Sequence, residues 1–179
     1  SLSRFVMTDH PLDNPIWRSL RSRHRALAVG DARVARYPAQ IAPFLGVAED
    51  AADIEDLLPS LLPPGDTALL LARTPAVSTR WELRHITDLA QMICPEPIEV
   101  SPYDDTARIV ELDASHRDDV LALTALVYPH YFRPHTMQLG RYFGIYHDGR
   151  LAAMAGERMG TDDYTELSAI CTHPDFLGR

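Results

Sequence analysis

The sequence predicts an α+β protein, in which a mainly antiparallel sheet flanked by helices is preceded by a small α/β unit. Residues 107–172 show the order strand, helix, short helix, strand, hairpin, strand, which does not fit an alternating parallel fold. Asp148-Gly149 separates two apolar runs and is the strongest hairpin signal in the chain. A proline-rich connector, residues 94–103, divides the chain into two parts. The expected domains are residues 1–100 and 101–179.

The charged residues of the 179-residue chain are 25 acidic and 17 basic, a formal net charge of −8. All 17 basic residues are arginine, which excludes Schiff-base catalysis, pyridoxal phosphate attachment and a Walker A phosphate loop, because each of these needs a lysine. Neither half has the basic surplus of a nucleic-acid-binding domain. The acidic balance favours cationic amines over nucleotides as ligands.

The cysteine count and the lengths of the apolar runs indicate a protein of the cytoplasm. Cys94 and Cys171 are too few for a disulfide scaffold, and the chain has no C-x-x-C pair for zinc or redox chemistry. We expect no membrane span, because no run of about 18 apolar residues occurs, and the N-terminus lacks the features of a secretory signal. His130 and His135 lack an H-E-x-x-H context, so we expect no metal site.

The elements expected in the first part follow from apolar spacing and from the residues that end helices. Asn14-Pro15 opens a helix over residues 16–23. A second helix is expected over residues 51–62, where Pro63-Pro64-Gly65-Asp66 ends it. Strands are expected at residues 24–29, 33–37, 67–72 and 81–86, with a short apolar segment at 89–93.

The second part has a more regular pattern. A strand at residues 107–112 precedes a helix that Asp113 or Ser115 caps and that Pro129 ends. Aromatic and histidine side chains crowd the loop and short helical piece that follow: Tyr128, His130, Tyr131, Phe132 and His135. The remaining strands are expected at residues 142–147, 150–158 and 164–172.

The tail of the chain carries the most specific motif. The strand Thr165–Thr172 runs into His173-Pro174-Asp175-Phe176-Leu177-Gly178-Arg179, and together with the Asp148-Gly149 hairpin it resembles the GNAT acyltransferase superfamily over about residues 107–179. The family's tail reads V-x-P-x-[YF]-[RQ]-G-x-G-x-[GA], and its backbone amides hold the coenzyme A pyrophosphate. Phe176 and Gly178 match this pattern, whereas Leu177 stands where arginine or glutamine is usual. The chain reaches Arg179 before the next glycine, so we expect the natural protein to continue into a helix.

The resemblance implies roles for individual residues. The end of the last strand, Ile170, Cys171 and Thr172, would lie beside the pantetheine arm of coenzyme A. The pyrophosphate loop would comprise Phe176, Leu177, Gly178 and Arg179. Loop residues before the hairpin would shape the acceptor pocket, although ordinary aromatic packing explains them equally well.

Glu166 is the candidate catalytic residue, because many family members carry a catalytic glutamate at this place on the strand. It would act as the general base that removes a proton from the acceptor amine. The alternative is an ordinary strand residue. Strand alternation predicts Glu166, Ser168, Ile170 and Thr172 on one face and Leu167, Ala169 and Cys171 on the other. Cys171 is expected to be a small core residue rather than a nucleophile, because no paired base is identifiable.

The function that the resemblance implies is transfer of an acetyl or other small acyl group from acyl-coenzyme A to a primary amine. The acceptor, a small amine or a peptide amine, is not defined by the sequence, and a homodimer is left open. A second hypothesis is a GNAT-like module that binds coenzyme A or a partner without catalysis. Its motivation is Leu177 and a first half without site residues.

A third hypothesis treats residues 107–179 as a plain α+β domain with an accidental tail. It requires that the hairpin and the last strand are not neighbours in one sheet. The element order of the first 100 residues is similar to a worn second copy of the GNAT half-fold, an analogy that no motif supports.

Overall fold

The computed structural model describes residues 10–72, 74–99, 108–127 and 129–178, and it forms two compact units. Unit 1 comprises residues 1–38, 43–78 and 160–164, and unit 2 comprises residues 39–42, 79–159 and 165–179. The division differs from the expected boundary at residue 100, because residues 79–99 group with the second part. The tip of the last hairpin, residues 160–164, groups with the first part.

Unit 1 is built on a short helix and a small sheet. Helix α1 (Pro15–Arg21) begins at a proline, which suits the first helical position because its missing N–H would have no partner there. The sheet pairs β1 (Val29–Gly30), β2 (Val34–Arg36) and β3 (Leu45–Val47) in that order, all antiparallel. A Cβ at Gly46 would lie 2.7 Å from the backbone of Trp17, so glycine permits the close approach of β3 to α1.

The core of unit 1 confirms the first expected helix and part of the strand predicted at 33–37. Its most buried side chains include Ile16 and Leu20 from α1 and Val34 from β2. A polar network also lies inside. The Tyr37 hydroxyl donates to Ser19 Oγ at 2.9 Å and lies 2.8 Å from His24 Nδ1.

Several elements expected in the first part are wrong, because side chains take backbone partners that a helix or strand would need. Of the helix expected at 51–62 only α2 (Leu58–Leu61) forms. The Asp53 carbonyl accepts from Arg33 Nη1 at 2.8 Å, and the Asp53 carboxylate accepts from Glu55 N at 3.2 Å. These bonds fix a turn where the helix would begin.

The strands expected in this part are likewise shorter than predicted. Residues Arg25–Leu27 form a 3₁₀ turn instead of a strand. The run at 67–72 contributes only the single bridge between Leu69 and Phe44. Residues 81–86 and 89–93 form neither strand nor helix. Large apolar side chains of this stretch, such as Ile86 and Leu89, are exposed, so they do not provide the packing that would stabilise an element.

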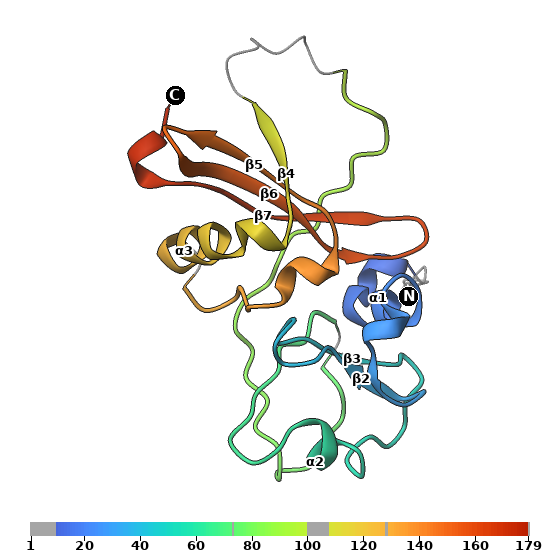
Figure 1. Cartoon of the computed structure of the whole chain (residues 1–179). Helices are drawn as coiled ribbons and strands as arrows, with labels where there is room; N and C mark the ends of the chain where they lie inside the picture. Colours follow the sequence, from blue (N-terminus) through green and yellow to red (C-terminus); the bar gives the residue numbers. More distant parts are fainter. Residues whose placement is uncertain (1–9, 73, 100–107, 128, 179) are drawn as a thin grey trace. The chain divides into compact units, whose positions relative to one another are not determined.

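Unit 2 contains the expected sheet (Figure 1). Its strands are β4 (Ile109–Leu112), β5 (Tyr142–His147), β6 (Arg150–Gly160) and β7 (Thr165–Thr172), in the order β4-β5-β6-β7. The β4–β5 and β5–β6 pairs are antiparallel. Because β6 and β7 are neighbours in one sheet, the observation required by the plain-domain hypothesis is not met.

One helix covers one face of this sheet. Helix α3 (Arg117–Val127) follows a 3₁₀ turn, Ala114–His116, whose N-cap is Asp113: its carboxylate accepts from Ser115 N at 2.9 Å. The prediction of a cap at Asp113 is therefore confirmed. The helix and the sheet share a core of Leu112, Val120, Leu123, Tyr142, Leu151 and Met154.

The predicted hairpin turn is confirmed. Asp148 and Gly149 both have positive φ, 51° and 74°, as a two-residue hairpin turn requires. The turn places His147 opposite Arg150, the first residue of β6. Both side chains therefore project from the end of the hairpin, near the residues that follow β7.

Candidate functional site

The predicted loop after β7 is a compact turn. His173 N donates to the carbonyl of Ala152 at 2.7 Å, which ties the start of the turn to β6. A 3₁₀ turn, Pro174–Phe176, follows, and Phe176 N donates to the His173 carbonyl at 2.9 Å. Gly178 has φ +74°. Arg179, the last residue assigned to the predicted loop, lies outside the described residues.

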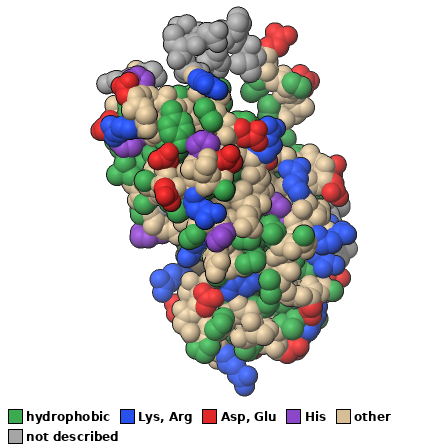
Figure 2. Space-filling model, viewed as in Figure 1, with side chains coloured by type: hydrophobic (Ala, Val, Ile, Leu, Met, Phe, Trp, Pro, Cys, Tyr) green, Lys and Arg blue, Asp and Glu red, His purple; other side chains and the backbone are tan. Residues whose placement is uncertain are grey.

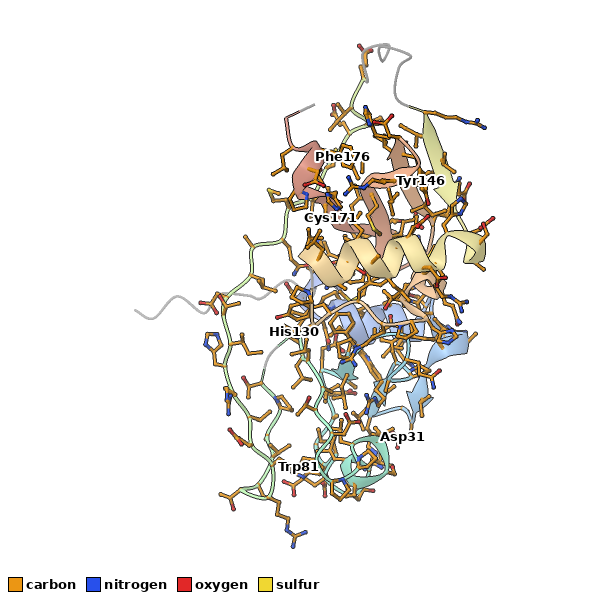
Figure 3. All side chains as sticks on the ribbon, turned by 60° about the vertical axis from the view of Figure 1, so that its left-hand side comes forward. Asp31, Trp81, His130, Tyr146, Cys171 and Phe176 are labelled. Atoms are coloured by element: carbon orange, nitrogen blue, oxygen red, sulfur yellow. The ribbon has the colours of Figure 1, made fainter. Side chains whose placement is uncertain are left out.

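Phe176 is the buried anchor of this turn, and three side chains surround its ring. The ring centres of His147 and His173 lie 5.3 Å and 5.6 Å from that of Phe176, and the Arg150 guanidinium carbon lies 5.0 Å from it. Arg150 Nη2 also donates to Asp175 Oδ2 at 2.8 Å. Figure 3 shows Phe176 beside the sheet of unit 2, in the same region as Cys171 and Tyr146.

The predicted alternation along β7 is wrong. Ala169 and Cys171 pack against the core as expected, but Leu167 is 70% exposed, although it was assigned to the same face. Ile170 is 62% exposed. The reason is Ala169, whose backbone is left-handed with a φ of 50° and interrupts the pleat. The alternation of side chains between the two faces of the sheet therefore does not continue unchanged from one side of Ala169 to the other.

Cys171 is partly buried and packs against the core of unit 2. Burial raises the pKa of its thiol to about 11, so the thiol is protonated at neutral pH. A thiolate nucleophile is therefore disfavoured at this position, in agreement with the expectation.

The carboxylate of Glu166 is already bound by three donors. Arg158 Nε and Nη2 donate to its two oxygens at 2.7 Å and 2.6 Å, and the backbone N of Met159 donates at 3.2 Å. The Arg158 and Glu166 side chains are 28% and 35% exposed, so the pair is partly shielded from water. A carboxylate offers about four lone-pair positions, which leaves about one for an incoming N–H or water.

Tyr142 lies near this ion pair and was not singled out from the sequence. Burial raises the pKa of Tyr142 well above its usual range, and the negative charges of Glu157 and Glu166 act in the same direction while Arg158 opposes them. The phenol therefore remains a hydrogen-bond donor at neutral pH. Its ring lies against Gly156, where a Cβ would clash with the ring atoms.

Arg150 and Arg158 are the other residues that sequence reasoning missed. Each is on β6, and each pairs with a carboxylate of β7 or of the turn that follows it. No local signal in the sequence marks them, because each pairing depends on how β6 lies against β7 and the turn that follows it.

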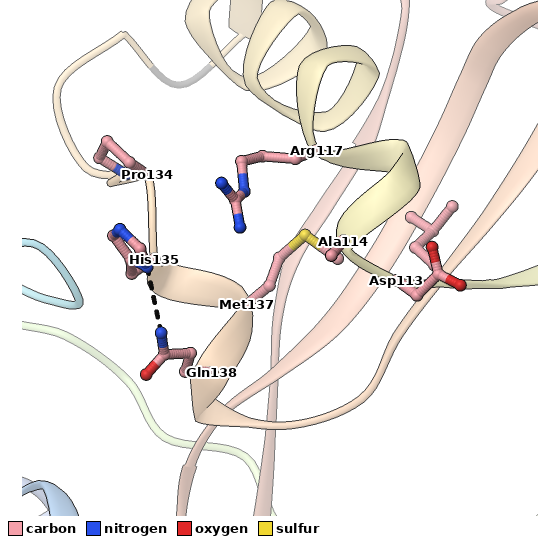
Figure 4. A pocket seen from close by; sticks show the side chains of 8 residues that line it. Asp113, Ala114, Arg117, Pro134, His135, Met137 and Gln138 are labelled. Carbon is pink, nitrogen blue, oxygen red and sulfur yellow. Dashed lines mark hydrogen bonds between the residues drawn. The ribbon is translucent and has the colours of Figure 1, made fainter.

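A separate small pocket of about 200 Å³ lies at the start of α3 in unit 2 (Figure 4). Its lining is Leu112, Asp113, Ala114, Arg117, Pro134, His135, Met137 and Gln138. Gln138 Nε2 lies 3.1 Å from His135 Nδ1. Of the described residues in the crowded loop noted in the sequence, only His135 lines this pocket. Phe132 instead packs edge-on against Tyr142, and Tyr128 lies outside the described residues.

Two further observations concern metals and membranes. Among the described residues, no three His, Cys, Asp or Glu side chains are grouped so that they could hold a metal ion. None of the helices in this part of the chain has the length and apolar character needed to span a membrane. On the face seen in Figure 2, arginine and acidic side chains are interspersed.

Comparison with known proteins identifies the family. No protein-family model matches the chain, and no curated protein matches its sequence. A solved structure does match. It is that of a GNAT-family protein from Novosphingobium aromaticivorans to which the name acetyltransferase has been assigned. The two are 31% identical with a TM-score of 0.71, and the match covers 96% of this chain and 75% of the other. This chain therefore belongs to the GNAT family, and the predicted fold class is confirmed.

Proposed function

We propose that this protein is an N-acyltransferase that moves an acetyl or other small acyl group from acyl-coenzyme A to a primary amine. The observation that carries the proposal is the turn His173–Gly178, which directly follows β7 in a sheet of the GNAT family. Family members hold the coenzyme A pyrophosphate at this place. In this chain the assigned residues are Phe176, Leu177, Gly178 and Arg179.

The position of β7 supports binding of the pantetheine arm. It is the last strand in the order β4-β5-β6-β7, so in the described part of the chain no further strand pairs with its outer edge. The backbone groups of Ile170, Cys171 and Thr172 on that edge are the proposed partners of the arm's amides. This contact does not depend on side chains, so the exposure of the Ile170 side chain is compatible with it.

The chemistry proposed for the site is direct transfer without a covalent enzyme intermediate. Glu166, acting directly or through a water, takes the proton of the acceptor ammonium, and the free amine attacks the thioester carbon. The C–S bond then breaks, and the sulfur takes up the second proton that the attacking nitrogen loses, so coenzyme A leaves as the thiol. The protonated Cys171 agrees with a mechanism that uses no enzyme thiolate.

Isothermal calorimetry with acetyl-coenzyme A tests this proposal. We expect saturable binding that coenzyme A competes for. The Glu166→Gln variant should bind acetyl-coenzyme A as the wild type does but should lose transfer to amines. The absence of any binding at millimolar ligand would overturn the proposal.

A second candidate, a GNAT module that binds coenzyme A without catalysis, is favoured by one observation. The bidentate pair with Arg158 occupies the carboxylate that the mechanism needs as a base. Binding of coenzyme A without turnover over a broad panel of amines, unaffected by Glu166→Gln, would support this candidate over the enzyme.

The proposed setting is the cytoplasm, with a small amine or a peptide amine as acceptor. Cys94 and Cys171 are both free thiols, which suits a reducing compartment. The net charge of −8 favours a cationic acceptor.

A further inference from the structure

The turn that follows β7 carries a negative charge where the proposed function places a diphosphate. Asp175 lies within the turn Pro174–Phe176, and its side chain is 61% exposed. An unpaired carboxylate at this place would repel the negative charges of a diphosphate bound to the same few residues. The site therefore needs a compensating cation.

Arg150 supplies that cation from the neighbouring strand. Its Nη2 donates to Asp175 Oδ2 at 2.8 Å and lies 3.1 Å from His173 Nε2, and its guanidinium stacks over Phe176 at 5.0 Å. The guanidinium thus contacts three of the four residues from His173 to Phe176. A second polar side chain near the ring is His147, whose Nδ1 lies 3.0 Å from Asp148 Oδ2.

We propose that Arg150 is a positioning residue for acyl-coenzyme A: it neutralises Asp175 and holds the turn so that the turn accepts the diphosphate. The inference rests on the proposed function and deepens it. Arg150 acts through Asp175 and Phe176, so its role depends on the charge of its partner. If Arg150 had a purely structural role, only its hydrogen bond to Asp175 would matter, and removing either side chain would have the same effect.

The direction in which Asp175→Asn changes the Kd for coenzyme A distinguishes these two roles. We expect Arg150→Gln to raise the Kd for coenzyme A about tenfold, because it removes the guanidinium that pairs with the Asp175 carboxylate. Asp175→Asn should bind coenzyme A as tightly as the wild type or tighter, since it removes the repulsion. The double variant should return to within about threefold of the wild type, and Arg150→Lys should restore most of the affinity lost in Arg150→Gln.

The chain offers a matched control in Arg141. This arginine also pairs with an exposed carboxylate, Glu111 at 3.0 Å, and stacks over a phenylalanine, Phe143 at 4.9 Å, but it lies on the β4–β5 side of the sheet. Arg141→Gln should leave the Kd for coenzyme A unchanged. Thermal unfolding should show that the Arg141→Gln and Arg150→Gln variants are folded and have similar Tm values.

Analogues of coenzyme A show which part of the ligand depends on Arg150. Dephospho-coenzyme A keeps the diphosphate, so it should show the same loss with Arg150→Gln. Pantetheine lacks the diphosphate, and its affinity should not change. A loss confined to coenzyme A itself would assign Arg150 to the ribose phosphate and overturn the inference.

The possible failures are distinguishable. A wild-type protein that binds no coenzyme A overturns the proposed function and with it this inference. A wild type that binds, with Asp175→Asn as weak as Arg150→Gln and the double variant no better, overturns the inference alone. All binding measurements use calorimetry of the whole chain at neutral pH.

Discussion

The two ends of strand β7 make the same kind of contact in different surroundings. Near its start Glu166 forms a bidentate pair with Arg158, in which both side chains are mostly shielded from water. Beyond its end Asp175 accepts one bond from Arg150, and both side chains are more than half exposed. A shielded pair fixes geometry and is costly to break, whereas an exposed pair contributes little stability and mainly sets local charge.

The residue between the two ends gives the largest expected effect. The Cys171 thiol has its pKa raised to about 11 by burial, so the rate of alkylation by iodoacetamide should rise about tenfold per pH unit from pH 7 to pH 10. Cys94 is exposed and serves as the internal reference in the same peptide-mapping experiment. A fast, pH-independent reaction at Cys171 would contradict the buried environment.

The same shift has a consequence for stability, and its sign is fixed. The folded protein holds the thiol proton more tightly than the unfolded chain, for which the reference pKa is 9.0. The stabilisation is therefore complete below about pH 9 and is lost as the pH rises through about 11. Replacing Cys171 with Ala should flatten this part of the curve of unfolding free energy against pH.

Catalysis distinguishes the two ends next. If Glu166 is the general base proposed above, Glu166→Gln should lower kcat about a hundredfold or more, because a general base contributes about that much. Asp175→Asn, at the other end, should leave kcat unchanged and act only on the KM for the acyl donor. Steady-state kinetics with acetyl-coenzyme A check both. Equal effects on kcat at the two ends would break the comparison.

The two ion pairs should differ less in their contribution to the free energy of unfolding. Arg158→Gln leaves a shielded carboxylate without its cation and should lower the free energy of unfolding by about 1–3 kcal/mol. Arg150→Gln should cost at most about 0.5 kcal/mol, as for other exposed pairs. Urea denaturation of both variants gives the values, and a larger loss for Arg150→Gln would reverse the assignment of the two pairs.

The smallest effect is expected at the bend within β7. Ala169 has a φ of 50°, which glycine adopts without strain, so Ala169→Gly should change the free energy of unfolding by less than about 1 kcal/mol, in the stabilising direction. Ala169→Val should be destabilising. Urea denaturation of the two variants gives both free energies of unfolding, and a destabilised Ala169→Gly variant would contradict a left-handed backbone at this residue.

Local chemistry explains what the sequence could predict of this fold. Asp148-Gly149 dictates its turn, and Asp113 caps the following segment, whatever surrounds them. The helix expected at residues 51–62 failed because Arg33, some 20 residues away, captures the Asp53 carbonyl. A contact between distant residues of this kind leaves no local pattern.

The candidate site shows the same limit. The turn after β7 could be found because its motif is contiguous in the sequence. Its electrostatic partners could not, since the pairing of Arg158 with Glu166 and of Arg150 with Asp175 depends on the register of β6 against β7. The left-handed Ala169 has no sequence signal either, because alanine is normally found in right-handed or extended backbone.

The open edge of β7 has a consequence for handling the protein. Within the described residues no strand pairs with the outer edge of β7, which also exposes Leu167 and Ile170, so this edge is a template on which a second chain can add its own strand. If the pantetheine arm occupies that edge, the ligand competes with self-association. Light scattering should then show particle growth with concentration in the free protein and its suppression by coenzyme A, so that the donor substrate also acts as a solubility factor.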